Sequence, residues 1–207
     1  MKNPPKLKQK LQVTKHHGIE IKDEYSWIHQ ENILEVLKDS SKLNPEVRKY
    51  LEEENAYTKF QMEDTEKFQK KLFTEIEGRI KLDDESLHFF YNKDGWEYWT
   101  KTTKENNYPI LLRKKIEDDK NKVQEYWNGD KEKKKLGSSY FGVGDLTVSH
   151  DHSLLGYSLD LNGSEFYTIY IRRISDEKII DEKIENTSGG ITFSKDNRFI
   201  FYTLLNE

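Results

Sequence analysis

Cysteine is absent from the sequence, and this absence excludes disulfide bonds and thiolate metal ligands. Long apolar runs are absent too: none approaches the ~20 residues needed to span a bilayer. The first ten residues are polar and basic, and no apolar segment follows them. We therefore expect a soluble, cytoplasmic protein with no membrane partner.

Alanine is nearly absent, since Ala56 is the only one, whereas lysine, asparagine, isoleucine and tyrosine are abundant. Those residues have A/T-rich codons, so the lysine count reflects the base composition of the genome as much as selection for a binding partner.

The sequence also lacks an excess of one charge: it has 34 basic and 38 acidic residues, for a net charge of −4. This balance excludes a globally basic nucleic-acid binder and leaves only a local basic patch open, so we expect no nucleic-acid partner. The basic runs Arg113-Lys114-Lys115 and Lys133-Lys134-Lys135 are interpreted as solvated edges.

Charged residues make up 35% of the chain and apolar residues 34%, a composition that leans toward disorder. Aromatic residues, at 13%, indicate the opposite, because disordered chains contain little Trp, Tyr or Phe. We therefore expect a folded protein with a heavily solvated surface.

The pattern of the first 30 residues predicts an extended segment of the chain. Pro4-Pro5 disfavours helix, and apolar residues alternate loosely with polar ones between residues 11 and 21. Asp23, Tyr25 and Trp27 are spaced as on one face of a strand. A short helix is expected over Ile33–Lys38.

The clearest helical signal covers residues 46–80, as one long helix or two abutting ones. Asn44 can cap the start, and Pro45 suits the first helical position because its φ is already set. Apolar residues recur at helical spacing; they are Val47, Tyr50, Leu51, Tyr57, Phe60, Phe68, Leu72, Phe73, Ile76 and Ile80. A helix this long needs an apolar surface to lie against.

After about Asp84 the periodicity becomes that of β-strands, with aromatic and β-branched runs between turn clusters. One antiparallel sheet is predicted from four runs, Leu87–Asn92, Trp96–Thr102, Ile110–Lys115 and Val123–Trp127. The predicted breaks between them are Lys93-Asp94-Gly95, Lys104–Asn107 and Glu117–Asn121.

A repeat follows this sheet. Thr147-Val148-Ser149-His150-Asp151 recurs 45 residues later as Thr192-Phe193-Ser194-Lys195-Asp196, and each copy precedes a strand-like run. Two more strand-like runs, Phe166–Ile174 and Lys178–Ile184, lie between the copies. A period of ~40–50 residues with four strands per unit is typical of β-propeller blades. The second copy reaches only two strands, so we expect an incomplete propeller that ends within a blade.

Ser149, Asp151 and His152 form the one cluster that suggests nucleophilic catalysis. Ser149 and Asp151 recur as Ser194 and Asp196, whereas Asn197 replaces His152. The repeated residues are therefore interpreted as turn-forming residues, whose Ser and Asp side chains cap a tight turn. Catalytic triads are assembled from separate parts of a fold, so we assign no catalytic residue here.

Two other patterns do not support a ligand-binding site. His16-His17 and His29 lack the spacing of a metal site, and we predict no metal and no cofactor. Gly142-Val143-Gly144 lacks the third glycine and the helix of a phosphate-binding loop, and is expected to allow close backbone approach. No G-x-S-x-G motif is present.

Several motifs resemble the prolyl oligopeptidase family, and within it the oligopeptidase B (protease II) branch. They are His17-Gly18, Asp23-x-Tyr25-x-Trp27, Pro45-Glu46-Val47 with Tyr50-Leu51-x-x-Glu54-Asn55, Glu75-Ile76 with Arg79-Ile80, Tyr108-Pro109-Ile110 with Arg113-Lys114, and the run from Ser149-x-Asp151 through Gly156-Tyr157-Ser158-x-Asp160 to Gly163-Ser164-Glu165-x-Tyr167-x-Ile169-x-Ile171-Arg172. The resemblance runs from about residue 4 to residue 207.

The resemblance implies a mainly β fold: an N-terminal helical segment, then a truncated seven-bladed propeller whose α/β-hydrolase domain is absent. Residues 1–85 would pack on that hydrolase domain, and residues 86–207 would form the first blades. The parent protein would be a serine-type peptidase that cleaves short peptides after Lys or Arg, with the propeller limiting substrate size. This chain alone should be inactive, since the family's catalytic residues follow the propeller. A non-catalytic propeller-type binding module and a prolyl-specific oligopeptidase remain the alternatives.

Overall fold

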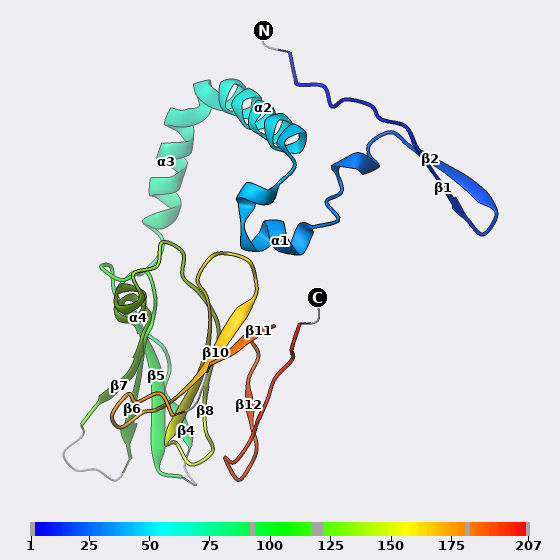
Figure 1. Ribbon diagram of the computed structural model, residues 1–207. Helices are drawn as coiled ribbons and strands as arrows, with labels where there is room; N and C mark the ends of the chain where they lie inside the picture. Colours follow the sequence, from blue (N-terminus) through cyan, green and yellow to red (C-terminus); the bar gives the residue numbers. More distant parts are fainter. Residues whose placement is uncertain (1–2, 92–93, 117–121, 181–182, 206–207) are drawn as a thin grey trace. The chain divides into compact units, whose positions relative to one another are not determined.

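The computed structural model describes residues 3–91, 94–116, 122–180 and 183–205 (Figure 1). The chain divides into two compact units, Met1–Ile80 and Lys81–Glu207. In the described part of the chain, no helix is both long enough and apolar enough to cross a membrane.

The first unit opens with a β-hairpin of β1 (Gln12–His16) and β2 (Ile19–Asp23). Its two-residue turn is His17-Gly18, and both residues have positive φ, 50° and 83°. Such turns match the twist of the paired strands. The strand-like face predicted for Asp23, Tyr25 and Trp27 is wrong. Asp23 Oδ1 accepts hydrogen bonds from the Tyr25 and Ser26 amides, at 2.7 and 3.1 Å, and starts a 3-10 helix, Ser26–Ile28.

The helices of this unit agree with the sequence pattern. Helix α1 covers Ile33–Lys38, and the long helical signal becomes two abutting helices, α2 (Pro45–Met62) and α3 (Glu66–Glu77). A short 3-10 turn, Glu63–Thr65, joins them. The Asn44 side chain accepts from the Glu46 amide at 2.8 Å, which is the predicted cap. Helix α3 stops before Ile80, so the predicted end was three residues too late.

The second unit begins with an antiparallel sheet, here called the first sheet. Its strands run in the order β3-β5-β6-β7, and β4 also pairs with β5. The bounds are β3 Asp84–Glu85, β4 Phe89–Tyr91, β5 Trp96–Thr102, β6 Ile110–Lys115 and β7 Gln124–Asn128. The four predicted strands are confirmed, and β3 is added to them. The predicted turn Glu117–Asn121 lies outside the described residues, as do Asn92 and Lys93 at the predicted end of β4.

The repeat forms two further sheets. The second sheet has the order β11-β10-β9-β8, with β8 Gly142–Val148, β9 Leu154–Asp160, β10 Tyr167–Arg173 and β11 Ile184–Thr187. The third sheet pairs β12 (Thr192–Phe193) with β13 (Ile200–Phe201). The run predicted over Lys178–Ile184 is confirmed in part: Ile179 forms an isolated antiparallel bridge with Arg172 of β10, and β11 begins at Ile184, whereas residues 181–182 lie outside the described part of the chain. Figure 1 shows β8 and β10 of the second sheet in yellow-green to orange.

A helix that the sequence interpretation missed, α4 (Gly129–Leu136), links the first and second sheets. Asn128 Oδ1 accepts from the Lys131 amide, and Gly137 at φ 64° ends the helix. The basic run at 133–135 therefore lies on a helix, not at a sheet edge. The other basic run is also not fully solvated, because Arg113 is only 4% exposed.

The core of the second unit fills the spaces between successive sheets. One cluster comprises Trp127, Phe141, Leu155, Tyr157, Leu159 and Ile174. A second comprises Ile169, Ile171, Ile191 and Phe193. The sheets are thus held face to face by apolar burial, and the turns at their ends are placed next to one another.

Candidate functional site

The turn between β8 and β9 holds the residues that first suggested catalysis. Ser149 Oγ donates to Asp151 Oδ1 at 2.6 Å and accepts from the Leu154 amide at 2.9 Å. Asp151 Oδ1 also accepts from the Ser153 amide at 3.1 Å. Burial works against the charge on Asp151, but the hydrogen bonds from Ser149 and Ser153 lower its pKa below the ordinary value. The hydroxyl and the carboxylate therefore serve the turn itself.

The second copy of the turn repeats these bonds. Ser194 Oγ donates to Asp196 Oδ1 at 2.6 Å and accepts from the Phe199 amide at 3.0 Å. Asp196 Oδ1 accepts from the Arg198 amide at 3.2 Å. The predicted turn chemistry is confirmed in both copies.

The imidazole of His152 is directed away from Ser149, toward the first sheet. His152 is only 7% exposed, its Nδ1 lies 2.8 Å from the Tyr98 hydroxyl, and its Nε2 lies 3.5 Å from Asp94 Oδ2. The ring stacks on Trp96 at 5.7 Å and on Tyr98 at 5.6 Å between ring centroids. Ser149, Asp151 and His152 are neighbours in sequence that do not form a relay.

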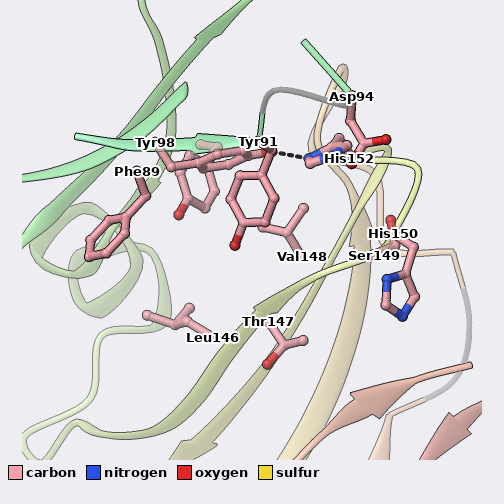
Figure 2. A pocket seen from close by; sticks show the side chains of 11 residues that line it. Phe89, Tyr91, Asp94, Tyr98, Leu146, Thr147, Val148, Ser149, His150 and His152 are labelled. Atoms are coloured by element: carbon pink, nitrogen blue, oxygen red, sulfur yellow. Dashed lines mark hydrogen bonds and ion pairs between the residues drawn. The ribbon is translucent and has the colours of Figure 1, made fainter. Parts of the chain in front are cut away.

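A cavity of about 450 Å³ opens beside this contact, between the first and second sheets. Figure 2 shows the rings of Phe89, Tyr91 and Tyr98 on one side of it and Leu146, Thr147 and Val148 of β8 on the other. Tyr126, Asp94, Ser149, His150 and His152 complete the lining. Its volume suits a side chain or a small molecule.

Charges of both signs lie near this cavity. Asp94 supplies a carboxylate at its edge, and the buried Arg113 guanidinium lies behind Tyr98, 3.3 Å from the hydroxyl. Arg113 also donates to the His152 carbonyl and to Gln124 Oε1, at 2.5 and 2.9 Å. Burial raises the pKa of Tyr98, while Arg113 opposes the shift. These charges offset each other, so the lining shows no preference for an anion or a cation.

The remaining sequence candidates lie elsewhere. His16, His17 and His29 are all exposed in the first unit, His17 in the hairpin turn. Among the described residues, no group of three or more His, Asp or Glu side chains is arranged to hold a metal ion. Gly142-Val143-Gly144 starts β8, as a strand and not as a phosphate loop. A Cβ at Gly144 would lie 2.5 Å from Ser158 Oγ, which confirms the expected close approach.

The sequence interpretation missed several buried charged groups of the second unit, Arg113 and Asp160 among them. Arg113 was hidden in a basic run, and no local pattern marks its burial. Asp160 is 1% exposed and accepts from the backbone amides of Asn162, Gly163 and Glu165, at 3.0, 2.9 and 2.8 Å. Its place before Asn162-Gly163 is a turn signal that could have revealed it.

Successive antiparallel sheets that pack face to face, with one turn repeated 45 residues apart, are typical of the β-propeller class of protein. The sequence profile of the prolyl oligopeptidase N-terminal β-propeller domain matches residues 4–207. The chain belongs to the prolyl oligopeptidase family.

Two curated relatives match most of the chain. It is 32% identical over 212 residues to dipeptidyl aminopeptidase BI of Pseudoxanthomonas mexicana, covering 96% of this chain and 28% of the relative. It is 26% identical over 199 residues to Protease 2 of Moraxella lacunata, covering 92% of this chain and 26% of the relative. The chain thus spans little more than a quarter of the length of these relatives.

Solved structures share the fold. Oligopeptidase B from Leishmania major superposes with a TM-score of 0.78 at 23% identity, over 99% of this chain and 29% of that structure. Oligopeptidase B from Trypanosoma brucei gives the same TM-score at 19% identity, with the same coverage. The expected resemblance to this family and its mainly β fold with an N-terminal helical segment are confirmed.

Proposed function

We propose that the chain is the N-terminal propeller portion of a serine-type oligopeptidase that hydrolyses short peptides after Lys or Arg. The observation that carries the proposal is the family match over residues 4–207. The match to Protease 2 supports a peptidase as the parent protein. The Lys/Arg preference rests on the sequence motifs that resemble the oligopeptidase B branch.

The parent protein combines this propeller with an α/β-hydrolase domain. Residues 1–85 pack on that domain, and residues 86–207 form the first blades of a seven-bladed propeller that limits substrate size. The exposed apolar side chains on α3 support this arrangement, since Phe68 and Phe73 are 64% and 65% exposed. An apolar stripe of this kind marks an interaction surface.

No residue of this chain takes part in the catalytic triad. The bonds of Ser149 support this view, because its hydroxyl is held by Asp151 and Leu154 in the same way as the Ser194 hydroxyl in the second copy. The purified 207-residue chain should therefore hydrolyse no peptide, and the Ser149→Ala variant should behave identically. A turnover that disappears in this variant would contradict the assignment.

Removal of dipeptides from a free N-terminus is a second candidate activity. The 32% identity to dipeptidyl aminopeptidase BI favours it. The two activities differ in the substrate end that they require, because an aminopeptidase needs a free α-amine and an endopeptidase accepts a blocked one.

The experiment begins with the DNA downstream of codon 207. If a hydrolase domain is encoded there, the full open reading frame is expressed and assayed on matched fluorogenic peptides with Arg, Lys or Pro before the scissile bond, each N-terminally blocked or free. Preferential cleavage of blocked Arg and Lys peptides is the expected result. A requirement for a free amine supports the second candidate, a preference for Pro contradicts the Lys/Arg proposal, and a stop codon with no downstream domain contradicts both activities.

A further inference from the structure

The fourth residue of the repeated turn has the same unusual backbone in both copies. His152 and Asn197 follow the Ser-x-Asp sequence, and their φ angles are 62° and 58°. Both amides donate to the carbonyl of the turn serine, at 2.9 and 2.8 Å. Asn and His are enriched among non-glycine residues in this left-handed region. The backbone requirement alone would be met best by glycine, so a side chain at this position needs a separate explanation.

In each copy this side chain contacts the preceding sheet. His152 belongs to the second sheet's turn, and its ring nitrogens face Tyr98 and Asp94 of the first sheet. Asn197 belongs to the third sheet's turn, and its Oδ1 accepts from the backbone amide of His150, in the second sheet's turn, at 2.8 Å. Asp94 lies between β4 and β5, as His150 lies between β8 and β9. The contact therefore passes from each turn to the sheet before it: Asn197 reaches the equivalent turn, and His152 reaches Asp94 of the equivalent turn and Tyr98 of the adjoining strand β5.

The left-handed backbone and a side-chain contact with the preceding sheet occur together at both positions. Apolar burial between the sheets is non-directional, whereas these hydrogen bonds fix one turn at a defined position against the next. The Arg113 bond to the His152 carbonyl adds a second directional contact at the first interface.

We propose that the residue after Ser-x-Asp is a blade-to-blade connector, which aligns each propeller blade with its predecessor through a directional bond from its turn to the preceding sheet. Its side chain is matched to what the preceding blade presents. His152 meets a tyrosine hydroxyl and a carboxylate, and Asn197 meets a backbone N–H.

Hydrogen exchange tests the Asn197 connector. Asn197→Gly removes the side chain while keeping the left-handed backbone accessible, and Asn197→Asp keeps an acceptor oxygen. Exchange of the His150 amide should become about tenfold faster in Asn197→Gly and stay close to wild type in Asn197→Asp. The amides of β9 are the reference for global opening. The amide of Lys195, which occupies the position equivalent to His150 and has no backbone or side-chain acceptor among the described residues, should exchange rapidly in all three proteins.

A double-mutant cycle tests the His152 connector. His152→Gly and Tyr98→Phe are compared singly and together in chemical denaturation, because the cycle cancels the effect of glycine on the unfolded chain. We expect the two substitutions to be coupled by about fivefold to tenfold in the unfolding equilibrium constant. His150→Gly paired with Tyr98→Phe is the matched control and should show no coupling, since the His150 side chain is exposed.

Each result decides the proposal. A selective increase in hydrogen exchange of the His150 amide, together with coupling between His152 and Tyr98 in the unfolding equilibrium, supports a connector that operates at both interfaces. His150 exchange that is unchanged in Asn197→Gly, or coupling below twofold at His152, overturns it. If a variant fails to fold, Tyr98→Phe alone in the wild-type background provides the second measurement, and unchanged stability there also overturns the proposal.

Discussion

At the scale of single residues, close packing explains one of the paired glycines at the start of β8. A Cβ at Gly144 would lie 2.5 Å from Ser158 Oγ and 2.8 Å from the Tyr167 ring. Gly144→Ala should therefore destabilise the second unit by about 1–3 kcal/mol, the usual cost of overpacking. Chemical denaturation measures this change. Gly190→Ala is the control, since nothing lies within 4 Å of its Cβ position, and an equal loss in both variants would contradict the steric argument.

Asp160 links the stability of the second sheet to pH. Burial opposes its charge, but the backbone amides that it accepts from hold the pKa of Asp160 below the ordinary value. A carboxyl with a lowered folded-state pKa stabilises the fold above its unfolded pKa of about 3.9, and this contribution is lost as the pH falls through the folded value. The free energy of unfolding should therefore decline as the pH is lowered from about 5 to about 2.

The variant that checks this linkage is Asp160→Asn. It replaces an acceptor oxygen with an N–H group that faces backbone donors, so it should lower stability at pH 7 by about 2–3 kcal/mol and reduce the pH slope. Asp64→Asn, at an exposed position in the first unit, should do neither. If the free energy of unfolding of Asp160→Asn declines with falling pH as steeply as that of the wild type, other carboxyl groups are responsible for the pH dependence.

At the scale of elements, one buried ion pair fastens α4 to β10. Arg172 Nη1 donates to Glu132 Oε1 at 2.7 Å, and Nη2 donates to the Tyr126 carbonyl at 2.8 Å. Arg172 and Glu132 are 3% and 8% exposed. Removal of Arg172 leaves the buried Glu132 carboxylate with Lys135, at 3.4 Å, as its remaining cationic partner, which is more costly than loss of an exposed pair.

Arg172→Gln and Arg173→Gln form a matched comparison on the same strand. Arg173 pairs with Asp176 at 2.8 Å, and both side chains are about half exposed. We expect Arg172→Gln to cost about 3 kcal/mol and Arg173→Gln less than about 1 kcal/mol. Thermal and chemical denaturation compare them, and similar losses would mean that the buried pair is not what fastens the helix.

At the scale of the whole molecule, the two units should separate under limited proteolysis. The boundary falls between Ile80 and Lys81, and residues 78–83 are all exposed. Brief trypsin treatment should cut after Arg79 or Lys81 and leave a fragment from about residue 82 that retains the near-UV circular dichroism of its aromatic core. Mass spectrometry identifies the cut. Earlier cleavage within β5–β10 would contradict a stable second unit.

The sequence by itself determined the elements whose signals are local. Asn44 and Pro45 mark the start of α2 through capping and a preset φ, alternation marks β5 and β6, and the 45-residue repeat marks equivalent turns. Hydrogen bonds and dihedral preferences between near neighbours suffice for these features, so a pattern in the chain predicts them. The family motifs belong to the same group, because they are read directly from the residues.

Only the tertiary structure decided which side chains meet across the sheets. Arg113 is buried although its neighbours in the basic run are not, α4 is held by Arg172 from 40 residues away, and His152 turns to Tyr98 instead of Ser149. These contacts depend on how twisted sheets pack face to face, and no local pattern encodes the partner. The tempting Ser-Asp-His cluster became a turn with its histidine directed to the neighbouring sheet, because short-range bonds satisfy the serine and aspartate while long-range packing places the imidazole.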